Sequence, residues 1–471
     1  MDAAELAFAG VVRQAELVRA GEVTPRELVE TYLERIDRLD PQLNAFRSVY
    51  RERALAEADQ AAARLKGGDE RPLLGVPVAI KDNTDVGGDV TTHGTNAYGE
   101  PAAADAEIVK RVRAAGAIVL GKTQVPPLCA MPCTESPTWG VTRNPWDVNR
   151  TPGGSSGGSG AAVAAGLVGA ALGTDGAGSI RFPAANNGLF GLKPQRGRVT
   201  LAPLPEHWHG MSVAGWLTRS VGDAALMFDA TMGNVPVDRD PPPPPARPFA
   251  DAAAARPEKL RVAYSLRPPP GTLAAGPDED VRRAVLDTAE LLRSLGHDVR
   301  EQDLDIPFDA VSHGVVRTIR GIAEEARTLS HYERLDLRFR RVTRLGELIP
   351  EAALARARAA EAAVAARVNR VFDAHDVVLT PVAPEPAFEV GRWEGRGMLW
   401  TLNGGARMIA FTALWNQTGQ PAAAVPAGWN AAGVPLSAQL VGRPNDEDTL
   451  LSLAGQLEAE RPWADRRPPV S

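Results

Sequence analysis

Apolar residues recur at helical spacing near the start of the chain. A capping box with proline at the first helical position occupies residues 24–27. It precedes a single apolar stripe made by Leu28, Tyr32, Ile36 and Leu39. This pattern predicts a helix over about 25–39.

Helical and strand patterns then alternate. Val76, Val78 and Ile80 share one face of a strand predicted over 72–80, which ends at Lys81. Further helices and strands are predicted in turn over about 107–115, 116–121, 158–166 and 168–174. Such alternation favours an α/β fold with a largely parallel or mixed sheet, and it places candidate catalytic residues at strand ends.

A proline-rich stretch, residues 241–248, interrupts this pattern. Because proline lacks the N–H that helices and strands need, we expect an exposed connection there, which could divide two domains. However, a strand pattern resumes at 260–264, and later helical patterns near 278–295 and 351–373 have apolar stripes that need a sheet to cover. We therefore predict one domain over 1–471: a helical segment at about 1–65, a catalytic core at about 66–235, and a C-terminal part at about 258–471 that completes the same sheet.

Composition and charge exclude several classes of partner. The net charge of −6 comes from acidic and basic residues mixed along all 471 positions, without a basic block suited to nucleic acid. The N-terminus lacks a secretory signal and no run approaches membrane-spanning length, so we expect a cytoplasmic protein without a membrane partner. Cys129 and Cys133 lie too close together for a useful disulfide and are interpreted as free thiols. A homodimer is compatible with the sequence, which does not specify the oligomeric state.

Two segments rich in small residues carry the candidate chemistry. Residues 153–159 and 173–181 each place serines in backbone that bulky side chains have vacated, so a carbonyl substrate could reach hydroxyls and amide N–H groups. Within the first segment, residues 154–158 fit the nucleophile-elbow pattern only weakly, and no Gly-Lys-Ser/Thr follows to make a phosphate loop. Ser159 precedes an alanine-rich stretch and is expected to cap a helix.

The second segment is the more specific of the two. The N–H groups of Gly176, Ala177, Gly178 and Ser179 on a tight turn after a strand can converge on one oxyanion. Ser179 would then be both nucleophile and donor. The seven histidines show no partner pattern, which leaves Lys81 as the alternative base.

Three motifs in this order and spacing resemble the amidase signature family. They are residues 75–83 around Lys81, residues 152–159 around Ser155, and residues 175–181 around Ser179. Further matches lie at 121–123, 144–147, 379–381, 416–421 and 439–444, so the resemblance runs almost the full length of the chain.

The resemblance implies the amidase-signature fold, with a central mixed β-sheet covered on both faces by α-helices. It also implies a catalytic triad in which Ser179 is the nucleophile, Ser155, on a cis peptide, is the bridging serine, and Lys81 is the base. Burial away from carboxylates would lower the pKa of Lys81 far enough for it to accept a proton. The implied reaction converts a small-molecule carboxamide into a carboxylic acid through an acyl-enzyme, and no metal or organic cofactor has a task in it.

Two departures from the family pattern concern the substrate. Ala177 stands where the family commonly has glycine, and we expect it to adopt an ordinary φ so that the oxyanion turn is preserved. The segment 124–139 also departs, and since it touches the substrate in relatives, we expect Met131, Cys133 and Trp139 to contact it. The frequent tryptophans suggest an apolar or aromatic acyl pocket.

Three alternatives stay open at this point. One is a thiol amidase that uses Cys133 beside Glu135. Another is a subunit that releases ammonia from glutamine or asparagine for a partner acting on aminoacyl-tRNA. The last is a catalytically silent scaffold that retains the fold.

Overall fold

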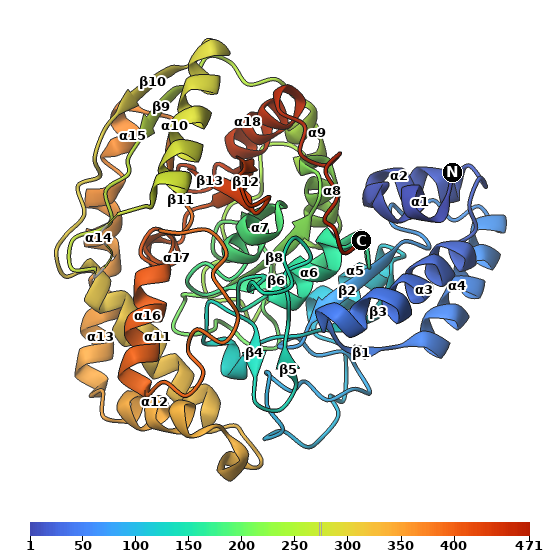
Figure 1. Ribbon diagram of the computed structural model, residues 1–471, viewed down its shortest axis with the longest axis horizontal. Coiled ribbons are helices and arrows are strands. Elements are labelled where there is room, and N and C mark those ends of the chain that lie inside the picture. The colour runs from blue at the N-terminus through green and yellow to red at the C-terminus, as the bar shows by residue number, and fades with distance from the viewer. Residues whose placement is uncertain (273, 275) are drawn as a thin grey trace.

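An eleven-stranded mixed sheet runs through the computed structural model, which describes residues 1–272, 274 and 276–471 (Figure 1). Its strand order is β1-β3-β2-β6-β8-β7-β12-β13-β11-β9-β10. The strands of this sheet are β1 (Phe46–Val49), β2 (Pro77–Lys81), β3 (Ile118–Thr123), β6 (Ala170–Asp175), β7 (Phe190–Lys193), β8 (Val213–Thr218), β9 (Arg261–Tyr264), β10 (Asp298–Glu301), β11 (Val377–Pro381), β12 (Ala422–Trp429) and β13 (Pro435–Val441). A separate pair joins β4 (Glu135–Ser136) to β5 (Gly140–Val141).

The middle of the sheet explains where the polar strand ends meet. Strands β2 and β6 are parallel neighbours, with Val78 opposite Ala170. Their carboxyl ends therefore lie at the same edge of the sheet, which brings Lys81 next to Thr174. Strand β8 then pairs antiparallel with β6, and the order continues antiparallel as far as β11.

Helices cover both faces of the sheet and build two separate apolar cores. Along β2, Ala79 faces one core and its neighbours Val78 and Ile80 face the other, as strand alternation requires. The first core contains residues of α1 (Ala3–Phe8), α3 (Pro25–Leu43), α6 (Gly157–Ala164) and α7 (Arg181–Asn187). The second contains residues of α5 (Glu107–Ala114), α8 (Val221–Thr231), α9 (Phe249–Ala254), α10 (Glu279–Ser294) and α18 (Glu447–Glu460). The predicted α/β architecture is thus confirmed.

The remaining helices gather beside the sheet. In Figure 1 a group of dark-yellow and orange helices runs along the left side of the molecule, away from the blue N-terminal helices on the right. That group includes α11 (Ala310–Ala326), α12 (Leu337–Glu347), α13 (Glu351–Ala359), α14 (Glu361–Val368), α15 (Val371–Ala374), α16 (Met398–Met408) and α17 (Ala413–Thr418). Helices α2 (Gly10–Arg19) and α4 (Arg51–Lys66), with two 3₁₀ turns at Pro127–Cys129 and Tyr332–Arg334, complete the described elements.

Several element boundaries differ from those predicted by the sequence pattern. The strand expected over 72–80 begins only at Pro77, because Gly75 (φ +79°) turns the chain against Pro25. The helix expected over 351–373 is divided into three, with breaks after Ala359 and Val368. Residues 241–248 contain no helix or strand and are largely exposed, and strands on both sides of them belong to the same sheet.

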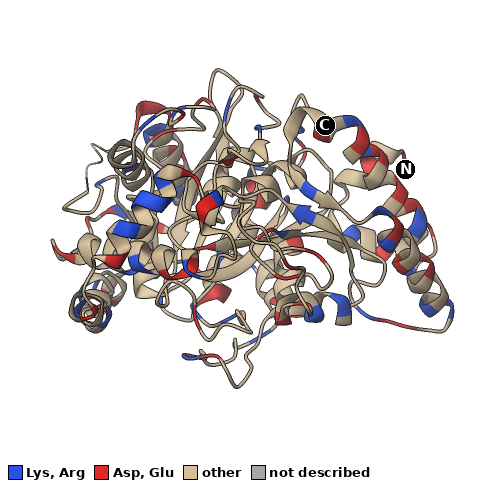
Figure 2. Ribbon diagram, turned by 90° about the horizontal axis from the view of Figure 1, so that it is seen from below, with Lys and Arg blue, Asp and Glu red and all other residues tan. Residues whose placement is uncertain are grey.

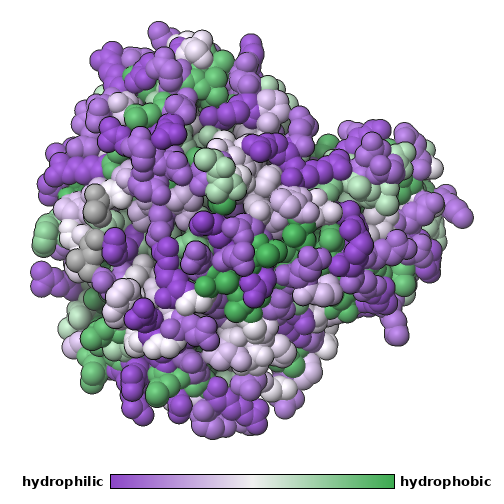
Figure 3. All heavy atoms as spheres, in the orientation of Figure 1, coloured by the Kyte–Doolittle hydropathy of each residue, from purple (hydrophilic) through white to green (hydrophobic). Residues whose placement is uncertain are grey.

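The surface is mixed in charge and mostly hydrophilic. Figure 2 shows acidic and basic residues interspersed over the helices, and Figure 3 shows hydrophilic residues over most of the face in view. Among the described residues, none of the helices combines the length and the apolar character that crossing a bilayer requires.

Candidate active site

Lys81 is fully buried at the end of β2 and contacts hydroxyl groups. Its Nζ lies 2.8 Å from Ser155 Oγ, 2.8 Å from Thr174 Oγ1 and 3.2 Å from the carbonyl oxygen of Thr174. No carboxylate of the described residues lies within ion-pair distance of this amine. Burial lowers the pKa of Lys81 to about 8, because an unpaired ammonium is poorly solvated inside the protein.

Ser155 is fixed by close packing of the backbone around it. The Gly154–Ser155 peptide is cis, as the family resemblance implied. A Cβ at Gly154 would lie 2.6 Å from backbone atoms of Met131 and Cys133, so a side chain cannot be placed there without moving the segment 131–133. Ser155 thus sits at the junction of three segments, the turn before α6, the segment 131–133 and the end of β2.

Ser159 does not cap a helix, contrary to the sequence prediction. Helix α6 begins at Gly157, so Ser159 is its third residue. Its hydroxyl donates to the carbonyl of Leu172 at 2.7 Å and pairs with Thr123 Oγ1 at 2.7 Å. Because the whole helix is buried, Ser159 satisfies polar groups of two neighbouring strands rather than its own helix terminus.

Asp175 fixes the turn that carries Ser179 through hydrogen bonds and an ion pair. This buried carboxylate accepts the N–H groups of Gly178 (2.6 Å) and Ile180 (3.2 Å), and it forms an ion pair with Arg181 at 2.9 Å. Burial alone would raise the pKa of Asp175, but the Arg181 guanidinium outweighs it and holds that pKa well below its usual range. The carboxylate is therefore charged at any working pH and keeps the turn in place.

The turn leaves three amide donors free. Among the described residues, the N–H groups of Gly176, Ala177 and Ser179 have no acceptor, whereas that of Gly178 is committed to Asp175. The sequence pattern predicts all four N–H groups as oxyanion donors, but in the structure the N–H of Gly178 donates to Asp175 instead. Ala177 does not have a positive φ, as expected; that conformation falls on Gly178 (φ +132°).

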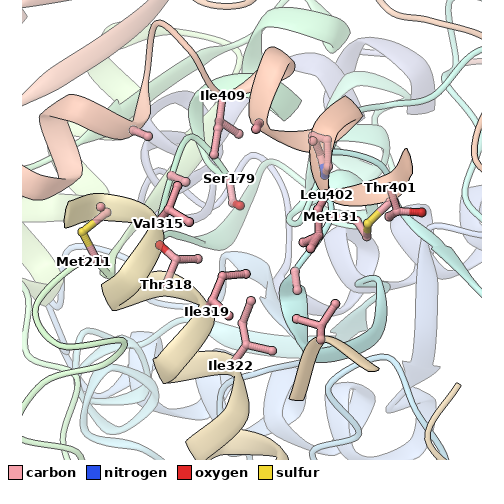
Figure 4. Close-up of a pocket in the computed structure, with 18 of the residues that line it drawn as sticks. Met131, Ser179, Met211, Val315, Thr318, Ile319, Ile322, Thr401, Leu402 and Ile409 are labelled. Atoms are coloured by element: carbon pink, nitrogen blue, oxygen red, sulfur yellow. The ribbon is translucent and has the colours of Figure 1, made fainter. Parts of the chain in front are cut away.

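Ser179 and Ala177 open onto a large apolar cavity of about 380 Å³. Figure 4 shows Ser179 between Met211 on one side and Met131 and Leu402 on the other, with the side chains of α11 facing it. The apolar lining consists mainly of Met131, Phe182, Trp208, Met211, Val315, Ile319, Ile322, Phe339, Val342, Leu345, Met398, Leu402, Ile409 and Leu414.

The three residues predicted to contact the substrate lie in different places in the structure. Met131 lines the cavity, whereas Cys133 and Trp139 are not among the described residues that line it. Cys133 is buried, and burial raises the pKa of its thiol well above the usual value. The Trp139 indole donates to the carbonyl of Thr95 at 3.3 Å. Cys133 therefore packs within the protein, and Trp139 lies partly exposed away from the cavity.

Most of the cavity wall was not predicted from the sequence. It comes from α11, α12, α16 and α17, whose apolar positions look like ordinary core stripes. Val315 and Leu345 are 44% and 40% exposed in the structure, yet in the sequence they look like the core positions of the same stripes. No cluster of three or more His, Cys, Asp or Glu side chains suited to a metal ion occurs in the described parts of the chain.

Comparisons with known proteins agree with this geometry. The profile of a family described as Amidase matches residues 27–451. The chain is 49% identical over 472 residues to a Mycobacterium tuberculosis protein named "Putative amidase AmiB2", with 100% of both chains covered. It is 35% identical to the 6-aminohexanoate-cyclic-dimer hydrolase of Paenarthrobacter ureafaciens, covering 97% of this chain and 95% of that one.

Solved structures give the same result. A 6-aminohexanoate cyclic dimer hydrolase complexed with substrate has a TM-score of 0.90 and 32% identity, covering 98% of this chain and 99% of that chain. A bacterial aryl acylamidase has a TM-score of 0.85 and 25% identity, covering 97% and 96%. The match over nearly the whole length, together with the three motifs gathered at one sheet edge, shows that this chain belongs to the amidase signature family and is an amidase.

Proposed function

We propose that this amidase hydrolyses the C–N bond of a small or medium carboxamide with apolar substituents, through an acyl-enzyme on Ser179 with Ser155 and Lys81 as the proton relay. The observation that carries the proposal is the contact of 2.8 Å between the buried Lys81 Nζ and Ser155 Oγ, beside a cavity that Ser179 lines. The contact of Lys81 with Ser155 supports the first step of the relay, and the resemblance to the amidase signature family supplies the step between Ser155 and Ser179.

The surroundings of Lys81 favour a neutral amine whose lone pair faces Ser155. A neutral amine has two N–H groups, and Thr174 supplies two acceptors, its carbonyl oxygen at 3.2 Å and its hydroxyl at 2.8 Å. The third neighbour, Ser155 Oγ, can then donate its proton to the lone pair. Asn83 Nδ2 bonds to the same Thr174 hydroxyl at 2.9 Å, which fixes its position.

The reaction proceeds in two halves. Lys81 takes the proton of Ser155, which takes that of Ser179, and the Ser179 oxygen bonds to the amide carbon. The free amides of Gly176, Ala177 and Ser179 stabilise the oxyanion. The relay returns a proton to the nitrogen as the C–N bond breaks, and the amine or ammonia leaves. Water then attacks the acyl-enzyme by the same route and releases the carboxylic acid.

The cavity wall supports an apolar substrate rather than glutamine. The α-amino and α-carboxylate groups of glutamine need charged partners when buried. Arg338 is the charged residue among the described lining, and it is already paired with Asp336 at 3.2 Å. This argues against the role of releasing ammonia for a partner, even though a glutamyl-tRNA(Gln) amidotransferase chain from Thermotoga maritima has a similar structure (TM-score 0.76, 28% identity).

A thiol mechanism is disfavoured by the position and protonation of both cysteines. Cys133 does not line the described cavity wall. Cys129 does, but burial raises the pKa of its thiol to about 12, so that the nucleophilic thiolate is scarce at neutral pH. Ser179 is the better nucleophile because the free amides of its turn adjoin it.

The test is a screen of primary amides, anilides and cyclic amides, with the cyclic amides included because of the cyclic-dimer hydrolases described above. We expect hydrolysis in at least one apolar class, a loss of at least roughly 10⁴-fold in Ser179→Ala, and labelling of Ser179 by a fluorophosphonate probe. Cys133→Ala is the matched control and should keep its activity. Activity that survives in Ser179→Ala but is lost in Cys133→Ala would overturn the proposal, and an unlabelled, inactive wild type would favour a scaffold.

A further inference from the structure

One side chain on the cavity wall has an unused hydrogen-bonding group. Gln417 lies on α17 and lines the cavity, yet it is only 2% exposed. Its Nε2 is buried and has no hydrogen-bond partner among the described residues. A buried amide donor without a partner is unusual in a folded protein, since such groups are nearly always paired with protein, water or a ligand.

The neighbouring residue shows how a structural amide behaves in the same helix. The Asn416 Nδ2 donates to the carbonyl and carboxylate of Asp175 and to the carbonyl of Met211, all within 3.0 Å. Its oxygen accepts from Arg181 at 2.6 Å. Asn416 is thus fully used in holding the turn below Ser179, whereas Gln417, one residue along, is left with an unpaired Nε2 on the cavity wall.

The cavity has room beside this amide. Gly314 on α11 faces Gln417 across the cavity, and a Cβ built there would lie 3.7 Å from Gln417 Oε1 and 3.8 Å from Met211 Cε. Because 3.7 Å is an ordinary contact distance, the missing side chain at Gly314 leaves a gap about one methyl group wide next to Oε1, and a half-turn of the terminal amide brings Nε2 to this gap. The other lining residues nearby, such as Val311 and Leu414, are apolar and offer the amide no partner.

The distance to the reacting atoms is set by α17. Thr412, just before this helix, donates its hydroxyl to the carbonyl of Ala177 at 2.6 Å, so the helix starts at the oxyanion turn. Gln417 is five residues further, roughly 7.5 Å of helical rise. Asn416, next to Gln417, bonds to Asp175 below the same turn, so the helix runs alongside the turn and holds Gln417 at a fixed place relative to Ser179.

We propose that the cavity contains a distal subsite in which the Gln417 amide donates to a neutral acceptor oxygen, such as an ether or ketone, on an otherwise apolar amide substrate. This names the substrate class of the proposed function and rests on it. The acceptor is neutral because a carboxylate in this apolar surrounding would lack a cationic partner.

The test measures binding, so that it does not depend on turnover. Ser179→Ala protein is titrated calorimetrically with matched pairs of amides of equal length, one bearing an ether oxygen and one a methylene at the same place. The oxygen is moved along the acyl chain in one series and along the amine chain in the other. Gln417→Met, which keeps the size of the side chain and removes its polar group, is then added to the same background.

We expect Gln417→Met to weaken the ether ligand about tenfold at one position of the series and to change its methylene partner less than twofold. Gly314→Leu, which fills the space from the facing helix and leaves the Gln417 amide in the protein, should weaken the same ligand, and it guards against misfolding caused by the first substitution. Thr401→Val, which removes a cavity hydroxyl already bonded to Gly397, is the matched control and should preserve the ether-to-methylene ratio.

Equal changes for both ligands of every pair in Gln417→Met would overturn the subsite. Failure of the proposed function has a different signature, because it appears as absent hydrolysis and absent Ser179 labelling in the wild type. If Gln417→Met selectively weakens ether binding but the wild type proves inactive on amides, the subsite is supported and the proposed hydrolysis is contradicted.

Discussion

Two buried lysines on adjacent strands have different surroundings. Lys122 on β3 is opposite Ile80 on β2, one residue from Lys81, and both lysines are inaccessible to solvent. Lys122 forms an ion pair of 2.8 Å with Asp82, whereas the hydrogen bonds of Lys81 within the described residues go to two hydroxyls and a carbonyl. Burial lowers the pKa of both amines, and Asp82 opposes that effect at Lys122.

The end of β2 serves two purposes. Asp82 directly follows Lys81 in the sequence, yet successive residues of an extended chain point to opposite sides. The carboxylate therefore faces Lys122 and Arg47, where it takes part in an ionic cluster with Asp89. The lysine that keeps a carboxylate has a structural role, and the lysine kept away from one can serve as a base.

Of the substitutions that separate the two lysines, Lys81→Met should have the largest effect, a loss of activity. We expect kcat to fall by at least roughly a thousandfold, because the relay loses its proton acceptor. The free energy of unfolding should change little, since no buried charge is left unpaired. Amide turnover and urea denaturation measure the two quantities, and a variant that is active but unstable would show that Lys81 is structural.

Lys122→Met should give the opposite result. We expect the free energy of unfolding to fall by about 3–5 kcal/mol, because Asp82 becomes a buried charge without its closest partner. Turnover per folded molecule should stay within a few fold of the wild type. Lys122→Met combined with Asp82→Asn should recover part of the stability, and a double variant no more stable than Lys122→Met would contradict the ion-pair explanation.

The pH dependence of the wild-type enzyme tests the role of Lys81 as the base. Because the base must be unprotonated and its pKa is about 8, kcat/KM should rise tenfold per pH unit below that value and level off above it. The profile is measured between about pH 5.5 and 9.5 with an uncharged amide. An acid limb near the ordinary pKa of a histidine would point to another base.

The smallest expected effect is that of Thr174→Val. Loss of one hydrogen bond to the neutral amine should lower kcat about tenfold. The same substitution should move the acid limb to lower pH, because the ammonium form loses an acceptor. Thr174→Ser restores the hydroxyl and should restore both values; if it does not, the Thr174 methyl rather than its hydroxyl is what matters.

The sequence predicts that the motifs around Lys81, Ser155 and Ser179 meet, as they do in the structure, but it does not predict the cavity wall, for a physical reason. Lys81, Ser155 and Ser179 lie in motifs whose glycines and strand ends dictate local backbone, so their meeting at one sheet edge follows from the pattern of β2 and β6. Ser159 was misassigned because a serine before an alanine-rich stretch suits a cap, although the helix begins two residues earlier.

The cavity wall depends on packing between distant helices. Val315, Phe339 and Leu402 come from three helices, and each fits a local apolar stripe that would serve equally well in a core. Only the packing angles of these helices leave space between them, and no local pattern encodes those angles. Trp139 and Cys133 are expected at the substrate because their segment touches it in relatives, but neither side chain lines the described cavity wall.

The hydrogen bond between Thr412 and the carbonyl of Ala177 has a consequence for how enzymes of this kind diversify. The residues of the proposed relay lie between positions 81 and 179, whereas α11, α12, α16 and α17, which shape most of the cavity, lie between 310 and 418. Substitutions in the C-terminal half of the chain can therefore change substrate selectivity without altering the residues of the proposed relay in the N-terminal half. Thr412 and Asn416 connect the two halves through hydrogen bonds. They limit that freedom, because any altered cavity wall must still support the turn that carries Ser179.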